Sequence, residues 1–454
     1  MVSVISYDGR GLLEDFSRTR ERVSADSNLQ LHGSSWCHST TFLPHQTNHN
    51  HWADIQRFSE TLAGPLPLLH TITIDLHQDP GDPEAMISPS AHLFSGAVNL
   101  KEFLFRSKIP SSLNHFVFPN LTMFEFWAGN EGFYASQLLD FLDASPMLRT
   151  VTLVFADSIL PENIPQERVV VLPNVEIIFM LVNEGGAGYR IAAHMSCPST
   201  RLTSFLHWRA FGDAPPEEIF PNPVPWDAIA RQYSGSPPEE VTFELEIAQG
   251  PTIRSCLKFH SPDETDLRLD FRVSRRDFDD ALMPLVVQEM YSEVLLQASR
   301  IIRNHPLVAN ISLLHFYHSS LILGSAQVRC LANEVRQLFA SLGPLEELGI
   351  YSCDVRPYLA SFFTSQESYK TDEPILFPPT KKLVISHPLY PSRAECVTAI
   401  VGLARSQHAR GVPFKHVTVY MENPPAEMAA RLQPWVGEAH CKHNAYVVRD
   451  GLPI

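Results

Sequence analysis

The sequence predicts an α/β repeat protein, a solenoid in which short strands form one curved, mainly parallel sheet and helices lie on its outer side. Three observations lead to this expectation. A short apolar phrase recurs along the chain, prolines stand before many of its copies, and stretches with helical spacing separate the copies. Units of this size must stack, because none of them can bury its own apolar side alone.

The phrase is an apolar anchor, two variable residues, an apolar residue, one variable residue and another apolar residue. Side chains alternate between the faces of a strand, so each copy predicts a short strand with one buried face. We expect the first five strands to lie side by side, parallel and in sequence order. These five copies are Leu69-x-x-Ile72-x-Ile74, Leu100-x-x-Phe103-x-Phe105, Leu121-x-x-Phe124-x-Phe126, Leu148-x-x-Val151-x-Leu153 and Val175-x-x-Ile178-x-Met180.

Less exact copies follow in the C-terminal part of the chain. They are Val308-x-x-Ile311-x-Leu313, Leu345-x-x-Leu348-x-Ile350, Thr380-x-x-Leu383-x-Ile385 and Phe414-x-x-Val417-x-Val419. Prolines stand just before many copies in both parts, at Pro67, Pro119, Pro146, Pro173, Pro306, Pro344, Pro379 and Pro413.

Helices are predicted between the strands, where apolar residues recur three and four apart. The clearest stretches are residues 134–142, 328–342 and 394–404. Residues 275–304 predict the longest helix, broken or started near Pro284. No helix start is expected after the glycine-rich turn at 183–188, which lacks the features of a phosphate-binding loop.

The repeat is poor between residues 203 and 305, where prolines cluster at 214–225 and strand candidates at 241–247 and 267–273 lack the full phrase. This middle part is either a degenerate continuation of the array or a boundary between two subdomains. The predicted organisation is a tail and first helix (1–60), repeat-like strands (61–205), the degenerate or inter-subdomain part (206–305), repeat-like strands (306–425) and a C-terminal cap (426–454).

The composition excludes several classes of protein. With 44% apolar and 19% charged residues the chain is expected to fold over most of its 454 residues. A net charge of −15 disfavours binding to nucleic acid or to an anionic membrane surface. No apolar run is long enough to span a bilayer, and the N-terminus has no secretory signal pattern. Seven scattered cysteines without a CxxC pair favour reduced thiols in the cytoplasm or nucleus.

The phrases FPNLTMFEF (118–126), SPMLRTVTL (145–153) and GPLEELGIYSCD (343–354) resemble the leucine-rich-repeat region of fungal F-box-domain proteins. The likeness covers about residues 62–205 and 305–425, and it implies an irregular leucine-rich-repeat solenoid. In that family the solenoid recognises a client protein, while an N-terminal F-box docks on the adaptor of a cullin-type ubiquitin ligase. The first sixty residues contain no L-P-x-E-I phrase, so the F-box itself is not recognisable. The LPENI at 160–164 lies between two repeat strands.

Neither a metal site nor a cofactor is expected. His49 and His51 form an H-x-H pair in a polar, turn-like stretch, and a zinc site needs three or four ordered ligands. The cluster of His440, Cys441 and His443 has no second ligand pair at zinc-finger spacing. No G-x-S-x-G or H-E-x-x-H motif occurs, so no catalytic residues are assigned.

The variable positions of the first five phrases should face away from the core and form a stripe along the sheet. Within this stripe Arg106, Glu125, Trp127, Phe179 and Leu181 combine aromatic and apolar anchors with charged neighbours, a mixture typical of protein interfaces. We expect them to bind a client protein. The alternative is that the middle segment or the N-terminal tail covers them.

The sequence therefore predicts a non-enzymatic, protein-binding solenoid, whose partners are a client protein and the adaptor of a ubiquitin ligase. The alternative, from another class, is a hydrolase or other enzyme on a two-domain α/β scaffold. One laterally continuous sheet would favour the first interpretation. Separate sheets with a polar cleft at the carboxyl ends of the strands would favour the second.

Overall fold

The computed structural model describes a set of segments, all within the second of two units of the chain, His38–Ile454. The described residues are 39–42, 69–76, 94, 97–107, 113, 116–128, 133–155, 164–165, 167–182, 187–210, 237–247, 252–274, 292, 294–296, 298–300, 302–303, 310–318, 325–352, 355–362, 377–387, 393–421, 425 and 427–443. Of the predicted tail, 1–60, they include Ser39–Phe42 alone.

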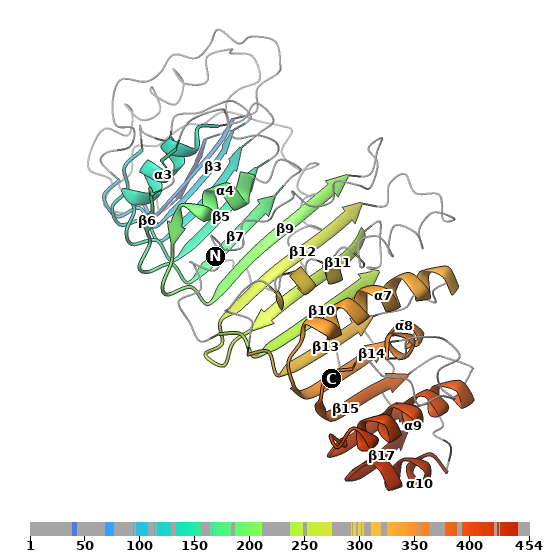
Figure 1. Ribbon diagram of the computed structural model, residues 1–454. Coiled ribbons are helices and arrows are strands. Elements are labelled where there is room, and N and C mark those ends of the chain that lie inside the picture. Colours follow the sequence, from blue (N-terminus) through green and yellow to red (C-terminus); the bar gives the residue numbers. More distant parts are fainter. Residues whose placement is uncertain are drawn as a thin grey trace. The chain divides into compact units, whose positions relative to one another are not determined.

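The described strands form an α/β fold with one large, mostly parallel sheet of 15 strands (Figure 1). Its first part runs in sequence order, with every neighbouring pair parallel. This confirms the prediction for the five strands that carry the first five phrase copies, whereas the first and last strands of this part were not predicted. These strands are β1 (Ser39–Phe42), β2 (Thr71–Leu76), β3 (Glu102–Ser107), β4 (Met123–Ala128), β5 (Thr150–Phe155), β7 (Ile177–Val182) and β9 (Leu202–Ala210). Two short strands, β6 (Val170–Val171) and β8 (Met195–Ser196), form a separate pair.

Strands from the middle part of the chain continue this sheet. They are β10 (Glu240–Ile247), β11 (Thr252–His260) and β12 (Asp266–Ser274), and their order in the sheet is reversed, β9-β12-β11-β10. The predicted strands at 241–247 and 267–273 are confirmed as β10 and β12, whereas β11 was not predicted. It is antiparallel to both of its neighbours. These are the two antiparallel pairings in the described sheet.

The C-terminal part returns to parallel pairing in sequence order. Its strands are β13 (Leu313–His318), β14 (Leu345–Ser352), β15 (Thr380–His387), β16 (His416–Met421) and β17 (Glu438–His443). The sheet is thus laterally continuous from β1 to β17 among the described residues.

The helices predicted at 134–142, 328–342 and 394–404 are confirmed as α3 (Ala135–Asp143), α7 (Ser325–Ser341) and α9 (Arg393–Ala409). The described residues of the predicted long helix, from 292 to 303, are also helical. The expectation that no helix follows the glycine-rich turn is wrong, because α4 begins at Ala187. Shorter helices are α8 (Arg356–Ser361), α10 (Met428–Leu432) and the 3-10 turn η6 (Gln433–Trp435).

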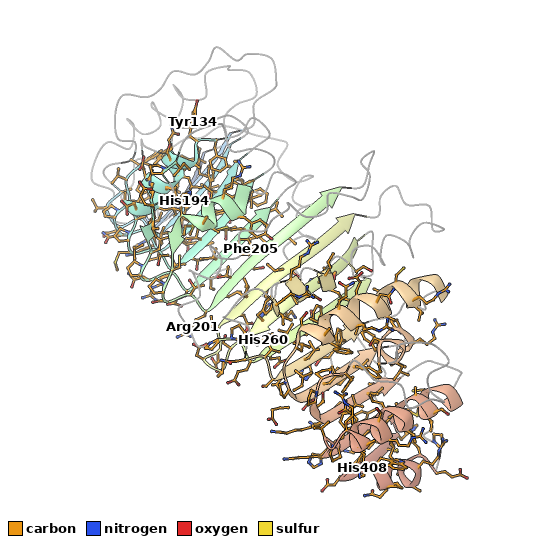
Figure 2. All side chains as sticks on the ribbon, viewed as in Figure 1. Tyr134, His194, Arg201, Phe205, His260 and His408 are labelled. Atoms are coloured by element: carbon orange, nitrogen blue, oxygen red, sulfur yellow. The ribbon has the colours of Figure 1, made fainter. Side chains whose placement is uncertain are left out.

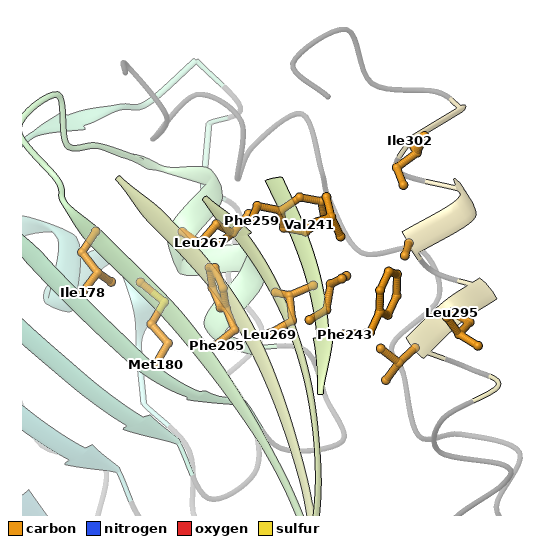
Figure 3. Close-up of a cluster of buried hydrophobic side chains, with 14 of the residues drawn as sticks. Ile178, Met180, Phe205, Val241, Phe243, Phe259, Leu267, Leu269, Leu295 and Ile302 are labelled. Carbon is orange, nitrogen blue, oxygen red and sulfur yellow. The ribbon is translucent and has the colours of Figure 1, made fainter. Parts of the chain in front are cut away.

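The phrase residues form the core, as their alternation predicts. All fifteen residues of the first five copies are buried, and they pack with the inner sides of the helices in one apolar cluster. On α3, for example, the Phe141 ring lies 4.4 Å from that of Phe124 on β4. The cluster continues through the middle strands, where Phe205, Leu269 and Phe243 face the same side as Leu295 of the helical segment (Figure 3).

One predicted register is wrong. The copy written as Val308-x-x-Ile311-x-Leu313 places Leu313 in the core, but Leu313 lies on the opposite face. The buried residues are Ile311, Leu314 and Phe316, which repeat the same spacing three positions later. Strand β13 therefore begins at the position that was predicted to end the phrase.

Candidate protein-interaction face

The variable positions of the phrases lie on the sheet face opposite the core, which we call the outward face. Strand pairing brings the predicted residues together there. Arg106, Trp127, Val154 and Leu181 are cross-strand partners in one row, and Glu125, Thr152 and Phe179 form the neighbouring row. All five residues predicted to bind a client therefore lie on one face of β3, β4 and β7.

Three of these residues contact one another. A guanidinium nitrogen of Arg106 lies 3.1 Å from Oε1 of Glu125, and Nε1–H of Trp127 donates to the same oxygen at 2.6 Å. The guanidinium carbon of Arg106 lies 4.8 Å from the centroid of the Trp127 ring, within range of a cation–π interaction. These contacts fix the indole on the sheet surface, so a partner binding there would meet an ordered aromatic side chain.

The outward face is less exposed than the sequence predicts. Trp127, Phe179 and Leu181 are each half-buried. Val154 between them and Leu206 on β9 are buried, with relative exposures of 7% and 4%. The N-terminal tail and the middle segment were considered as covers for this face. Of the tail, the structure describes β1, and of the middle segment it describes the end of β9, β10–β12 and helical residues between 292 and 303.

A second group of polar side chains on this face was not predicted. At its centre is His315 on β13, which is 14% exposed and lies between two carboxylates. Its Nδ1 is 3.0 Å from Oε1 of Glu240 on β10, and its Nε2 is 3.5 Å from Oε1 of Glu347 on β14. The other oxygen of Glu347 is 2.7 Å from Nζ of Lys382 on β15. We call these four residues the central network.

The protonation states in the central network follow from this geometry. Burial alone would lower the pKa of His315, but the hydrogen bond to Glu240, the 3.5 Å contact with Glu347 and the negative charges of both carboxylates outweigh burial and raise that pKa to about 9. The close contact with His315, followed by the hydrogen bond from Lys382, outweighs burial and lowers the pKa of Glu347 to about 2. His315 is therefore protonated at neutral pH. An imidazolium cannot accept a proton, so His315 does not have the properties of a general base.

A glycine beside His315 makes room for it. A Cβ at Gly349 on β14 would lie 2.7 Å from the His315 ring and 2.6 Å from the Tyr351 ring, closer than carbon atoms pack. The rings of Tyr317 and Tyr351 stack with centroids 4.7 Å apart and planes 6° apart, and both meet His315 edge-on. Burial, followed by nearby carboxylates, raises the pKa of Tyr317 to about 12, so its hydroxyl stays protonated.

Further ion pairs connect the antiparallel strands. Asp266 accepts from His260 at 2.6 Å and from Arg268 at 2.9 Å, while Arg254 lies 2.8 Å from Asp270 (His260 is labelled in Figure 2). Lys258 pairs with Glu244. Acidic and basic groups alternate on these neighbouring strands and pair with one another. This part of the outward face is consequently an ordered polar surface.

The other predicted sites can be placed in part. No cluster of three or more potential metal ligands occurs among the described residues. In the C-terminal cluster, Cys441 pairs across the strands with the core residue Val419, whereas His440 faces outward. His49 and His51 lie outside the described residues. No helix in the described part of the chain combines the length and apolar character of a membrane span.

The fold defines the chain as an α/β protein with a large, mostly parallel sheet. No family model matches its sequence, and no match was found among curated proteins.

Proposed function

We propose that this chain is a non-enzymatic, protein-binding solenoid of the leucine-rich-repeat type, and that it holds a client protein on its outward face. The observation that carries the proposal is the ordered group of Arg106, Glu125 and Trp127, in strand register with Leu181 and one row from Phe179. Aromatic residues and arginine dominate the binding energy of protein interfaces, particularly when neighbouring residues exclude water from them.

The lateral continuity of the sheet supports the repeat interpretation. Fifteen described strands lie in one sheet, and the phrase residues of the first five copies belong to one apolar cluster with those of the C-terminal strands, as stacked repeats require. Separate sheets with a polar cleft would instead have favoured the two-domain enzyme scaffold considered as the alternative.

We further propose that the client is handed to a ubiquitin ligase, acting in the cytoplasm or nucleus. Support for this step is the resemblance of the repeat phrases to those of F-box-domain proteins. The five described cysteines are free thiols, which suits a reducing compartment.

Client binding is tested with variants of the outward face. A protein captured with the wild type would be purified, and its affinity measured against Trp127→Ala/Phe179→Ala and against Arg329→Ala. Arg329 is exposed on α7 and serves as the control. We expect the double variant to lose at least about tenfold in affinity, which corresponds to about 1.4 kcal/mol. Equal affinity for all three proteins would show that the client binds elsewhere.

Ligase coupling has a separate test. The tagged chain would be purified from cells and probed for the ligase adaptor and the cullin, beside a protein with a recognisable F-box as positive control. Recovery of both components supports the coupling. If the control recovers them and this chain does not, the ligase proposal is wrong, while client binding stands on its own test.

A further inference from the structure

The last strand of the sheet, β17, has one described neighbour. It pairs with β16 in parallel, from His416↔Glu438 to Met421↔His443, and no described strand lies on its other side. A sheet edge of this kind presents a row of backbone donors and acceptors that another strand can pair with.

The backbone groups at this edge can be assigned from the pairing. The N–H of Glu438 donates to the carbonyl of Lys415 at 2.8 Å, so Glu438 directs its backbone groups toward β16. Successive residues of a strand alternate in this respect, so those of His440 and Lys442 also point toward β16. The backbone groups of Ala439, Cys441 and His443 therefore point away from β16, to the side where no described strand lies.

The side chains at the edge divide in the same way. Glu438, His440 and Lys442 lie on the outward face and are exposed. Ala439 and Cys441 lie on the core face and are half-buried, whereas their cross-strand partners Val417 and Val419 are completely buried. The apolar core thus ends at two small side chains that are still partly exposed at the edge of the sheet.

We propose that a second copy of this chain pairs with the edge, so that two β17 strands lie antiparallel about a twofold axis at His440. In this register Ala439 of each copy is opposite Cys441 of the other. Both residues direct their backbone groups to the edge, so they exchange two hydrogen bonds in the narrow pairs of an antiparallel ladder. His440 of one copy lies opposite His440 of the other, in a pair without hydrogen bonds.

The outward side chains are complementary in this register. Glu438 of each copy lies opposite Lys442 of the other, so the dimer places two pairs of opposite charge side by side. Within one chain Glu438 lies 3.1 Å from His416 and 3.4 Å from His440, and Lys442 lies 5.8 Å from the centroid of the Tyr420 ring. Among the described residues, no lysine pairs with Glu438 and no carboxylate pairs with Lys442. A twofold arrangement satisfies both residues at once and closes the edge, which limits assembly to two copies.

Crosslinking tests the register. Cα atoms in antiparallel pairs without hydrogen bonds are about 4.5 Å apart, within the range that a disulfide spans. In a background with Cys330→Ser and Cys441→Ser, we expect His440→Cys to form an interchain disulfide under mild oxidation. Lys442→Cys is the matched control, because residue 442 is also exposed on the same strand face but its Cα atom would lie about 14 Å from that of residue 442 in the other copy. Failure of His440→Cys to crosslink, or equal crosslinking of both variants, overturns the proposal.

Charge reversal tests the partner. Light scattering should give the mass of two chains for the wild type, and Lys442→Glu should weaken the dimer about tenfold, because it places like charges opposite each other. Adding Glu438→Lys to that variant exchanges the charges and should restore the dimer. A wild type that is monomeric at all concentrations, or a double variant no better than the single one, contradicts the proposal. A segment of the same chain pairing with this edge would give the monomer.

Discussion

His315 makes the stability of the protein depend on pH through residues from neighbouring strands. In the unfolded chain its pKa is near 6.5, and in the folded chain it is about 9. The proton is therefore bound more tightly in the folded state, and the stabilisation it gives is complete below pH 6.5 and disappears as the pH rises through 9. The pKa of Glu347 is lowered to about 2, so its contribution is present above 4.5 and disappears as the pH falls toward 2.

We predict that His315→Gln lowers the free energy of unfolding most between pH 4.5 and 6.5, by about 1–3 kcal/mol, and that the difference from the wild type shrinks between pH 6.5 and 9. Urea unfolding at a series of pH values measures it. Arg329→Gln, at an exposed position of α7, is the control, because its difference in unfolding free energy from the wild type should not change with pH. A difference that does not change between pH 6 and 9 would mean that His315 is not held protonated by its carboxylates.

A second feature at the scale of the residue is the position directly before the phrase anchor, in the turn that precedes a strand. Nδ2–H of Asn120 donates to the carbonyl of Val98 at 2.8 Å, and Nδ2–H of Asn174 donates to the carbonyl of Pro146 at 3.0 Å. Each bond joins a turn to the preceding turn. Met147 occupies the corresponding position before β5, where a methionine side chain has no donor, and it is 48% exposed.

Met147→Asn should therefore add a hydrogen bond to the carbonyl of Pro119 and stabilise the protein by about 0.5–1.5 kcal/mol. Thermal unfolding measures the change. Met147→Ala removes the same exposed apolar surface without adding a donor, so it should not raise the melting temperature. If the asparagine variant behaves like the alanine variant, the turns do not stack closely enough for this bond.

At the scale of the strand, the two faces of the first repeats should respond differently to substitution. Leu148 is completely buried ahead of β5, and Leu148→Ala should cost about 2–5 kcal/mol through lost burial and the cavity left behind. Trp127→Ala with Phe179→Ala removes two half-buried side chains from the outward face, so we expect a smaller cost. Circular dichroism melts compare the two. A double variant that melts as low as Leu148→Ala would show that the outward aromatics belong to a second core.

The strands were predictable where the phrase is complete, because its alternation reports burial directly. Strand β13 was placed three residues early, since Val308 and Ile311 fit the spacing as well as Ile311 and Leu314 do. In that register His315 and Tyr317 would face the core, and the predicted stripe was in any case limited to the first five phrases. The phrase copies at β9, β10 and β17 were missed because each departs from the full pattern. At β9 the anchor and the next phrase residue are threonines, Thr200 and Thr203, and at β10 the anchor is a proline, Pro238. At β17 the two residues after the anchor Val436 are the small Ala439 and Cys441.

The central network could not be predicted, for a physical reason. Glu240 and His315 are 75 positions apart in the chain, and they meet because β10 pairs directly with β13. This pairing depends on the insertion of β11 and β12 on the other side of β10, which reverses the expected strand order. The five outward residues of β3, β4 and β7 were predictable because their strands follow one another without such a rearrangement.

For the whole molecule, the middle strands connect two sets of parallel strands, so their packing should control how cooperatively the sheet unfolds. Leu269 on β12 is buried between Phe205 on β9 and Leu257 on β11 in strand register. In stacked arrays, stability is roughly a sum of repeat and neighbour terms. We predict that Leu269→Ala broadens or splits the urea unfolding transition, whereas Leu348→Ala on β14 lowers its midpoint with less change in shape. Transitions of equal width would contradict this coupling role.

The hairpin of β11 and β12 also bears on how such a chain can change in length. Between β9 and β10 the sheet reverses direction twice, from β12 to β11 and from β11 to β10. Two reversals cancel, so β13–β17 run the same way as β1–β9, and their phrase residues still face the same core. A hairpin can thus be inserted or deleted during evolution without changing the direction of the strands that follow it. A single antiparallel strand would reverse the direction of every later strand.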